Sequence, residues 1–103
     1  MGSDYMFKII LESVDAKQLD KVYEKNNVNY LVRDEENFEI LGELSTCGYD
    51  VFSSDDMDKL LLELERLKEK VHEVLAVKHI EEIISLAVRC KETKGSRLIF
   101  TPF

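Results

Sequence analysis

The chain is poor in several residues that mark particular classes of protein: it has no tryptophan, one proline, four glycines and two cysteines in 103 residues. Cys47 and Cys90 lie far apart and lack the spacing of a zinc or redox motif, so we expect free thiols, with a disulfide between them as the alternative. No apolar run approaches 18 residues, which argues against a membrane-spanning helix. Residues 1–5 are predicted to be a loose leader. They do not resemble a signal peptide, which points to the cytoplasm or to an export route that this sequence does not show.

Motifs that carry common catalytic chemistry are also missing. The chain contains no phosphate-binding loop, nucleophile elbow, HExxH helix or dinucleotide fingerprint. His72, His79 and Cys90 match no known spacing of metal ligands, and we expect both histidines to be partly exposed on helices. The prediction is therefore a protein that is not an enzyme and that holds no metal and no cofactor.

Positive charge is scarce. Lys and Arg number 14 against 21 Asp and Glu, which gives a net charge of −7. Residues 1–58 hold fourteen acidic and five basic residues, whereas residues 59–103 hold seven and nine. Nucleic-acid binding requires basic patches, so we expect no nucleic-acid partner. The acidic first half is predicted to attract a basic partner, and the alternative is that its charge only favours solubility.

A strong helical pattern covers residues 53–71, and the rest of the chain can be arranged around it. Its apolar stripe follows helical spacing and consists of Met57, Leu60, Leu61, Leu64, Leu67 and Val71. Ser53 or Ser54 is suited to cap the first turn. The predicted solvent face carries Glu63, Glu65, Arg66 and Glu69, and Leu62 lies off the stripe as a candidate contact.

A second helix is predicted over residues 76–93, after a break between about 72 and 77. The break is needed because the two apolar stripes differ in direction by roughly 150° at 100° per residue. Gly95 is expected to end the second helix.

The remaining segments read as strands around one shorter helix. We predict strands over 6–12, 28–33, 38–41, about 49–52 and 97–101, and a helix over 15–26. The turn at 34–37 would join 28–33 and 38–41 into a hairpin, and Gly42 suggests a bulge or a close approach. A chain of this length is expected to form one domain. The fold class is predicted to be α+β, a largely antiparallel sheet of four to five strands with three helices in the order β-α-β-β-(β)-α-α-β.

The candidate binding residues gather at the predicted hairpin tip. Acidic residues interleaved with tyrosine suit docking onto a basic protein surface. The predicted partner-binding set is Asp34, Glu35, Glu36, Glu39, Glu43, Tyr30, Tyr49 and Asp50. The alternative is a turn whose charges serve only solubility.

The runs LGELSTCGYDVFSSDDMDKLLLELERLK, HIEEIISLAVRC and LIFTPF resemble small bacterial immunity proteins encoded beside polymorphic or contact-dependent toxins. The resemblance covers about residues 40–103. It implies a protein that neutralises a cognate toxin, for instance a basic nuclease. Immunity proteins share no common fold, so no residue role is carried over. The alternative is a module that self-associates as a homodimer through edge strands such as 6–12 or 97–101.

Overall fold

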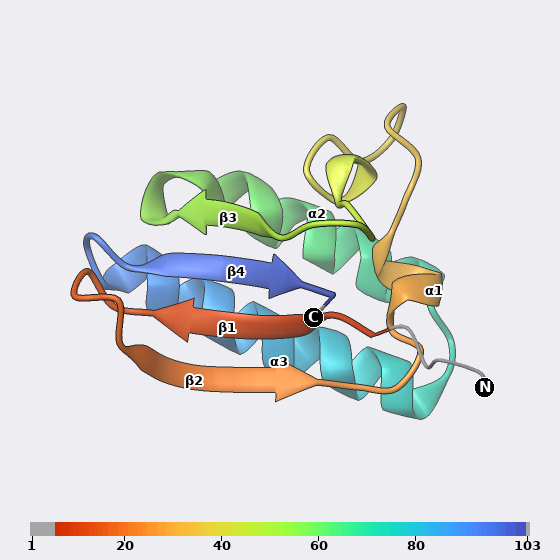
Figure 1. Cartoon of the computed structure of the whole chain (residues 1–103). Coiled ribbons are helices and arrows are strands. Elements are labelled where there is room, and N and C mark those ends of the chain that lie inside the picture. The colour runs from red at the N-terminus through yellow and green to blue at the C-terminus, as the bar shows by residue number, and fades with distance from the viewer. Residues whose placement is uncertain (1–5, 103) are drawn as a thin grey trace.

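A four-stranded antiparallel sheet with helices against one face forms the body of the protein (Figure 1). The computed structural model describes residues 6–102, so the predicted leader over 1–5 lies outside the described residues. The strands are β1 (Lys8–Glu12), β2 (Gln18–Tyr23), β3 (Asp50–Ser53) and β4 (Arg97–Thr101), in the spatial order β2-β1-β4-β3. The helices are α1 (Val28–Leu31), α2 (Met57–Lys70) and α3 (Val74–Glu92), with 3₁₀ turns η1 (Leu41–Glu43) and η2 (Ser54–Asp56). The predicted α+β class is confirmed.

The core lies between the sheet and the two long helices, α2 and α3. Alternate residues of each central strand point into it, because successive side chains of a strand face opposite sides of the sheet. The strands contribute Ile9, Leu11, Leu98 and Phe100, and the helices contribute Leu60, Leu64, Leu67, Ile80, Ile83 and Ala87, all fully buried. Phe100 meets the rings of Phe7 and Phe52 edge-on, at centroid distances of 6.3 and 5.8 Å.

The second half of the chain folds as the apolar stripes predict. Helices α2 and α3 match the predicted helices over 53–71 and 76–93. The expected break falls at 71–73, where Val71 and Glu73 adopt extended backbone angles. The backbone N–H of Ser53 donates to Asp56 at 2.9 Å, which fixes the turn that leads into α2.

The helix predicted over 15–26 is wrong, because residues 18–23 form strand β2. Ala16 takes a positive φ of 64° in the turn that joins β1 to β2, where the Ser13 hydroxyl accepts a hydrogen bond from the Lys17 N–H at 3.2 Å. Leu19 and Tyr23 are exposed on this strand. Val22 packs against the core from the strand instead.

The hairpin predicted over 28–33 and 38–41 is also wrong. Residues 28–31 form the single helical turn α1, residues 39–40 lie in a turn, and Leu41 begins η1. Phe38 and Leu41 are both buried, and their spacing of three residues suits a helical turn rather than an alternating strand. The acidic segment 34–37 does form a turn, within an irregular loop rather than between strands.

Strands β1 and β4 occupy the middle of the sheet, where each pairs with two neighbours. The prediction that 6–12 and 97–101 are edge strands is therefore wrong, whereas the short strand expected near 49–52 is confirmed as β3. On the outer strands β2 and β3, the N–H groups of Lys21 and Ser53 donate to Asp20 and Asp56. An N–H bound in this way cannot pair with a further strand.

Among the described residues, no helix is both long enough and apolar enough to cross a membrane.

Candidate functional site

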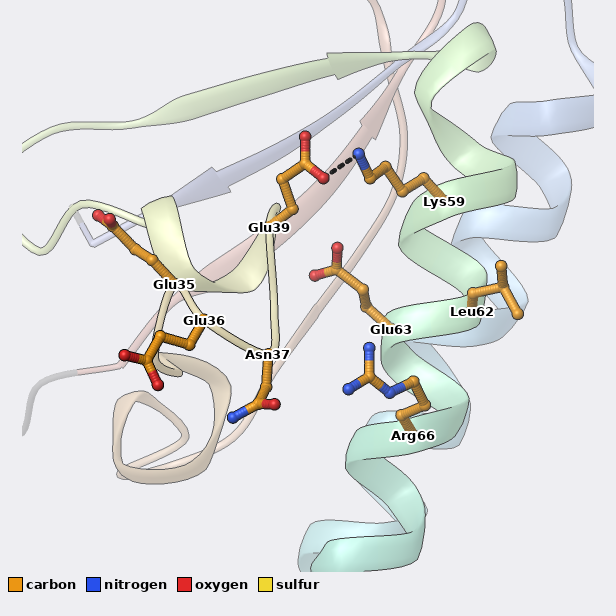
Figure 2. A pocket seen from close by; sticks show the side chains of 8 residues that line it. All are labelled: Glu35, Glu36, Asn37, Glu39, Lys59, Leu62, Glu63 and Arg66. Atoms are coloured by element: carbon orange, nitrogen blue, oxygen red, sulfur yellow. Dashed lines mark ion pairs between the residues drawn. The ribbon is translucent and has the colours of Figure 1, made fainter.

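The predicted acidic residues border a groove between the segment 35–39 and helix α2 (Figure 2). The groove has a volume of about 460 Å³. It is lined by Glu35, Glu36, Asn37 and Glu39 from the loop and by Lys59, Leu62, Glu63 and Arg66 from α2. Three of the eight predicted binding residues are therefore brought together at one site.

The loop that carries these carboxylates is held in shape by Asp34. Its carboxylate accepts hydrogen bonds from the side-chain amide of Asn37 at 2.7 Å and from the Asn37 backbone N–H at 3.2 Å. The backbone N–H of Phe38 donates to the Asp34 carbonyl at 3.0 Å and closes the turn. The Asn37 side chain lowers the pKa of Asp34, with smaller contributions from backbone N–H groups and from Arg33. Asp34 thus organises the loop while remaining exposed and charged.

A buried aromatic ring and a glycine fix the base of the loop. Phe38 is buried, and the guanidinium groups of Arg33 and Arg66 lie 5.5 and 4.9 Å from its ring centroid. A Cβ atom on Gly42 would lie 2.7 Å from the Cα of Glu35, so only glycine allows the two backbone segments to approach this closely. This is the close approach at Gly42 that the sequence suggested.

Glu63 ties the loop to helix α2. It points from α2 toward the loop (Figure 2), and its carboxylate accepts the backbone N–H groups of Ile40 at 3.0 Å and Leu41 at 2.9 Å. Glu63 is buried, so its predicted place on the solvent face is wrong. Its spacing gives the reason: it lies three residues after Leu60 and four before Leu67, on the same helical face as the core stripe.

The charges around the groove are not all available to a partner. Glu39 forms an ion pair with Lys59, as Figure 2 shows. Glu35 and Glu36 are exposed, point away from α2, and take part in none of the ion pairs found among residues 6–102. The lining as a whole carries four carboxylates and two cations, a net charge of −2. Beside them Leu62 is 68% exposed, which confirms that it lies off the core stripe.

The other predicted binding residues lie outside the groove lining. Asp50 is half-buried and accepts the Ser45 N–H at 2.9 Å, so its carboxylate closes the turn before β3. Tyr49 is exposed beside it, and Glu43 is exposed at the end of η1. The predicted set of eight is therefore distributed over more than one place.

Tyr30 takes part in a different cluster. Its ring meets the ring of His79 edge-on at a centroid distance of 6.4 Å, and its buried hydroxyl has no hydrogen-bond partner among residues 6–102. Burial raises the pKa of Tyr30 to about 12, and the charges of Glu24, Glu73 and Glu82 act in the same direction. Tyr30 is thus a packing residue of the region around His79.

The two histidines and two cysteines have separate environments. His72 is exposed, whereas His79 is 1% exposed, so the expectation of two partly exposed histidines is wrong for His79. Cys47 is exposed, Cys90 is buried, and both are free thiols. Within the described range 6–102, no group of three or more His, Cys, Asp or Glu side chains is placed to hold a metal ion.

Comparison of the chain with protein-family models, with curated proteins and with solved structures found no match.

Proposed function

We propose that this chain is a non-catalytic binding protein that neutralises a basic toxin domain, in the manner of an immunity protein. The acidic rim of the groove between segment 35–39 and α2 would contact the partner. The proposal combines the resemblance of residues 40–103 to immunity proteins with the charge and shape of this site.

The observation that carries the proposal is the state of Glu35 and Glu36. Both carboxylates are exposed and lie outside the ion pairs of the described residues. An acidic pair without internal partners can form charge-assisted bonds to arginine or lysine of another protein. The exposed Leu62 adds apolar area beside the groove, and a contact that combines apolar and charged groups is typical of protein interfaces.

Electrostatics also indicates how binding would proceed. A chain with a net charge of −7 attracts a basic protein over a distance and accelerates encounter, and salt weakens this attraction. The same charge repels nucleic acid. A basic nuclease domain, with a surface built to hold phosphates, is a partner of suitable chemistry.

The test is binding to the protein encoded by the neighbouring gene, which the proposal expects to be a basic toxin, measured with the double variant Glu35→Lys/Glu36→Lys. These positions suit the test because neither side chain supports the fold through an ion pair. We expect the association rate constant at low salt to fall about tenfold or more and protection of toxin-expressing cells to be lost.

The matched control is Asp15→Lys/Glu92→Lys, which changes the net charge equally at exposed positions that lie outside the groove lining and outside the ion pairs of the described residues. It should reduce association less than the groove variant, because it changes only the overall field. Equal effects of the two double variants would exclude the groove as the interface. A neighbouring toxin that does not bind the wild-type chain would exclude the proposed function itself.

A further inference from the structure

No helix or strand of residues 6–102 packs on the face of the sheet opposite α2 and α3, which is the face turned toward the viewer in Figure 1. Burial alternates along the strands, so the residues between the core positions point to this side. We call this surface the open face. It comprises Gln18, Lys21 and Tyr23 of β2, Lys8, Ile10 and Glu12 of β1, Arg97, Ile99 and Thr101 of β4, and Val51 and Ser53 of β3.

An apolar row crosses the centre of the open face. Ile10 is paired with Ile99, and Ile99 with Val51, so the three side chains are neighbours on adjacent strands. Val51 is 46% exposed and Tyr23 is 55% exposed. Large apolar residues gathered on one face of a sheet are characteristic of an interaction surface.

The charge of the open face is opposite to that of the chain. The open face has three cations, Lys8, Lys21 and Arg97, and one acid, Glu12. Its net charge is +2, whereas the net charge of the chain is −7. Arg97 pairs with Glu12 at 2.6 Å. The lysines are confined to β1 and β2, whereas the open-face residues of β3 and β4 between Val51 and Thr101 include no lysine. The β3–β4 half carries Arg97 as its one cation, so the lysines of two such faces stay apart where the β1–β2 half of one covers the β3–β4 half of the other.

We propose that the open face binds a second copy of this chain, face to face, about a two-fold axis parallel to the strands between β1 and β4. Such an axis places β1 over β4 and β2 over β3 of the second copy. The lysine-bearing half of each sheet then covers the lysine-free half of the other. This inference goes beyond the proposed function and does not depend on it.

The register of the sheet specifies the contacts that this symmetry makes. Ile10 lies over Ile99 of the second copy, at the centre of the interface. Lys21 lies over Val51 of the second copy, since both residues belong to the row through Ile10 and Ile99. Glu12 lies over Arg97 of the second copy, so the existing ion pair gains a symmetric counterpart. No lysine faces a lysine, whereas an axis perpendicular to the strands would place Lys21 over itself.

The size of the face agrees with a dimer contact. Four strands about 4.8 Å apart, with four to six residues each at about 3.3 Å, present roughly 14 by 17 Å before side chains are added. Two such faces bury on the order of 1,000 Å² in total, which is near the lower limit of specific interfaces. The groove residues belong to segment 35–39 and α2, and none of them is part of the open face, so both acidic grooves lie outside the sheet–sheet contact.

The experiment is sedimentation equilibrium in about 0.15 M salt, where repulsion between two acidic chains is screened. We expect the wild-type chain to pass from monomer to dimer between about 1 and 100 µM. Val51→Lys places a lysine over Lys21 of the second copy and should raise the dissociation constant at least about tenfold. Val51→Glu places an opposite charge there and should lower it. The double variant Val51→Lys/Lys21→Glu should restore dimerisation.

The control is Val88→Lys, an exposed valine on α3 in the other layer, which should leave the dissociation constant unchanged. Val51 is half-exposed on an outer strand, so its variants are expected to fold, and a thermal melt verifies this. A wild-type chain that remains monomeric up to about 100 µM overturns the proposal. A dimer that responds equally to Val51→Lys and Val51→Glu also overturns it. Either result leaves the binding test of Glu35 and Glu36 unaffected.

Discussion

Asn27 and His79 are joined by a buried hydrogen bond of 3.1 Å between Asn27 Nδ2 and His79 Nε2. Phe7 fixes the orientation of the Asn27 amide, because Oδ1 accepts the Phe7 N–H at 2.6 Å and Nδ2 donates to the Phe7 carbonyl at 2.9 Å. Nδ2 is therefore also the donor toward His79, and His79 Nε2 accepts without a proton. The ring proton then lies on Nδ1, which donates to Glu82 at 3.3 Å. The structure thus selects one neutral tautomer of His79.

The first prediction concerns pH. Burial lowers the pKa of His79 below its usual value of 6.5, although Glu82 and Glu24 act in the opposite direction. At a pH between the pKa values of His79 in the folded and the unfolded chain, the unfolded chain binds more protons. The contribution of His79 to the free energy of unfolding is therefore fully present above pH 6.5 and is lost as the pH decreases below 6.5. Urea unfolding at about pH 5.5 should give a lower free energy of unfolding than at about pH 7.5.

Carboxylates also titrate toward low pH, so the comparison needs matched variants. His79→Gln removes the titrating ring and should show a smaller loss of stability between the two pH values than the wild-type chain. His72→Gln changes an exposed histidine and should behave as the wild type. If the pH dependence of His79→Gln equals that of the wild type, the neutral-tautomer argument is wrong.

The second prediction concerns Asn27 itself. Asn27→Ala leaves the Phe7 N–H and carbonyl without their partner inside the protein and removes the donor to His79. Buried polar groups without partners are costly, so we expect a loss of about 2–4 kcal/mol in the free energy of unfolding. Asn29→Ala, at an exposed position of α1, should change it by less than about 0.5 kcal/mol. A loss below about 1 kcal/mol for Asn27→Ala would show that water replaces the amide.

The elements of the second half of the chain are long and those of residues 15–41 are short, and this difference explains which elements the sequence could predict. In α2 and α3 the apolar stripe is long and regular, and both helices and the break between them follow from it. Strand β4 follows from its own run of β-forming residues. In residues 15–41 each element is six residues or shorter, so periodicity over one or two turns cannot separate helix from strand. The pairing of β2 with β1 decided the structure there, and that contact is not visible in the segment itself.

The sequence predicted the acidic residues of the candidate site but not the helix that forms its other side. The acidic turn at 34–37 was visible as a run of like residues, and Glu35, Glu36 and Glu39 do border one groove. The contribution of α2 was not predicted, because Glu63 is expected on the solvent face of the helix. Its partners are backbone N–H groups of a loop 22 and 23 residues away, which no local pattern reveals. The spacing of Glu63 from Leu60 and Leu67, which places it on the core face of the helix, was the signal that could have predicted its burial.

The third prediction tests the contact at the base of the loop. Gly42→Ala would place a Cβ atom 2.7 Å from the Glu35 Cα, which is backbone and cannot move alone. We expect a loss of about 1–3 kcal/mol in the free energy of unfolding, as for other substitutions that overfill a packed site. Gly48→Ala is the matched control, because its new Cβ would have the Ser45 hydroxyl as its nearest neighbour at 3.9 Å. Equal stability of the two variants would show that the loop shifts away from Gly42 without cost.

The last prediction separates the support of the loop from the stability of α2. Glu63→Leu favours the apolar stripe of the helix but removes the acceptor of the Ile40 and Leu41 N–H groups. Leaving these two donors unpaired should lower the free energy of unfolding by about 2–3 kcal/mol. Hydrogen exchange should accelerate at Ile40 and Leu41 more than in α2, because the loop opens before the helix does. Glu69→Leu, at an exposed position of the same helix, should leave both amides protected. If exchange at Ile40 and Leu41 is as slow in Glu63→Leu as in the wild type, another group holds the loop, and the position of Glu35 and Glu36 does not depend on Glu63.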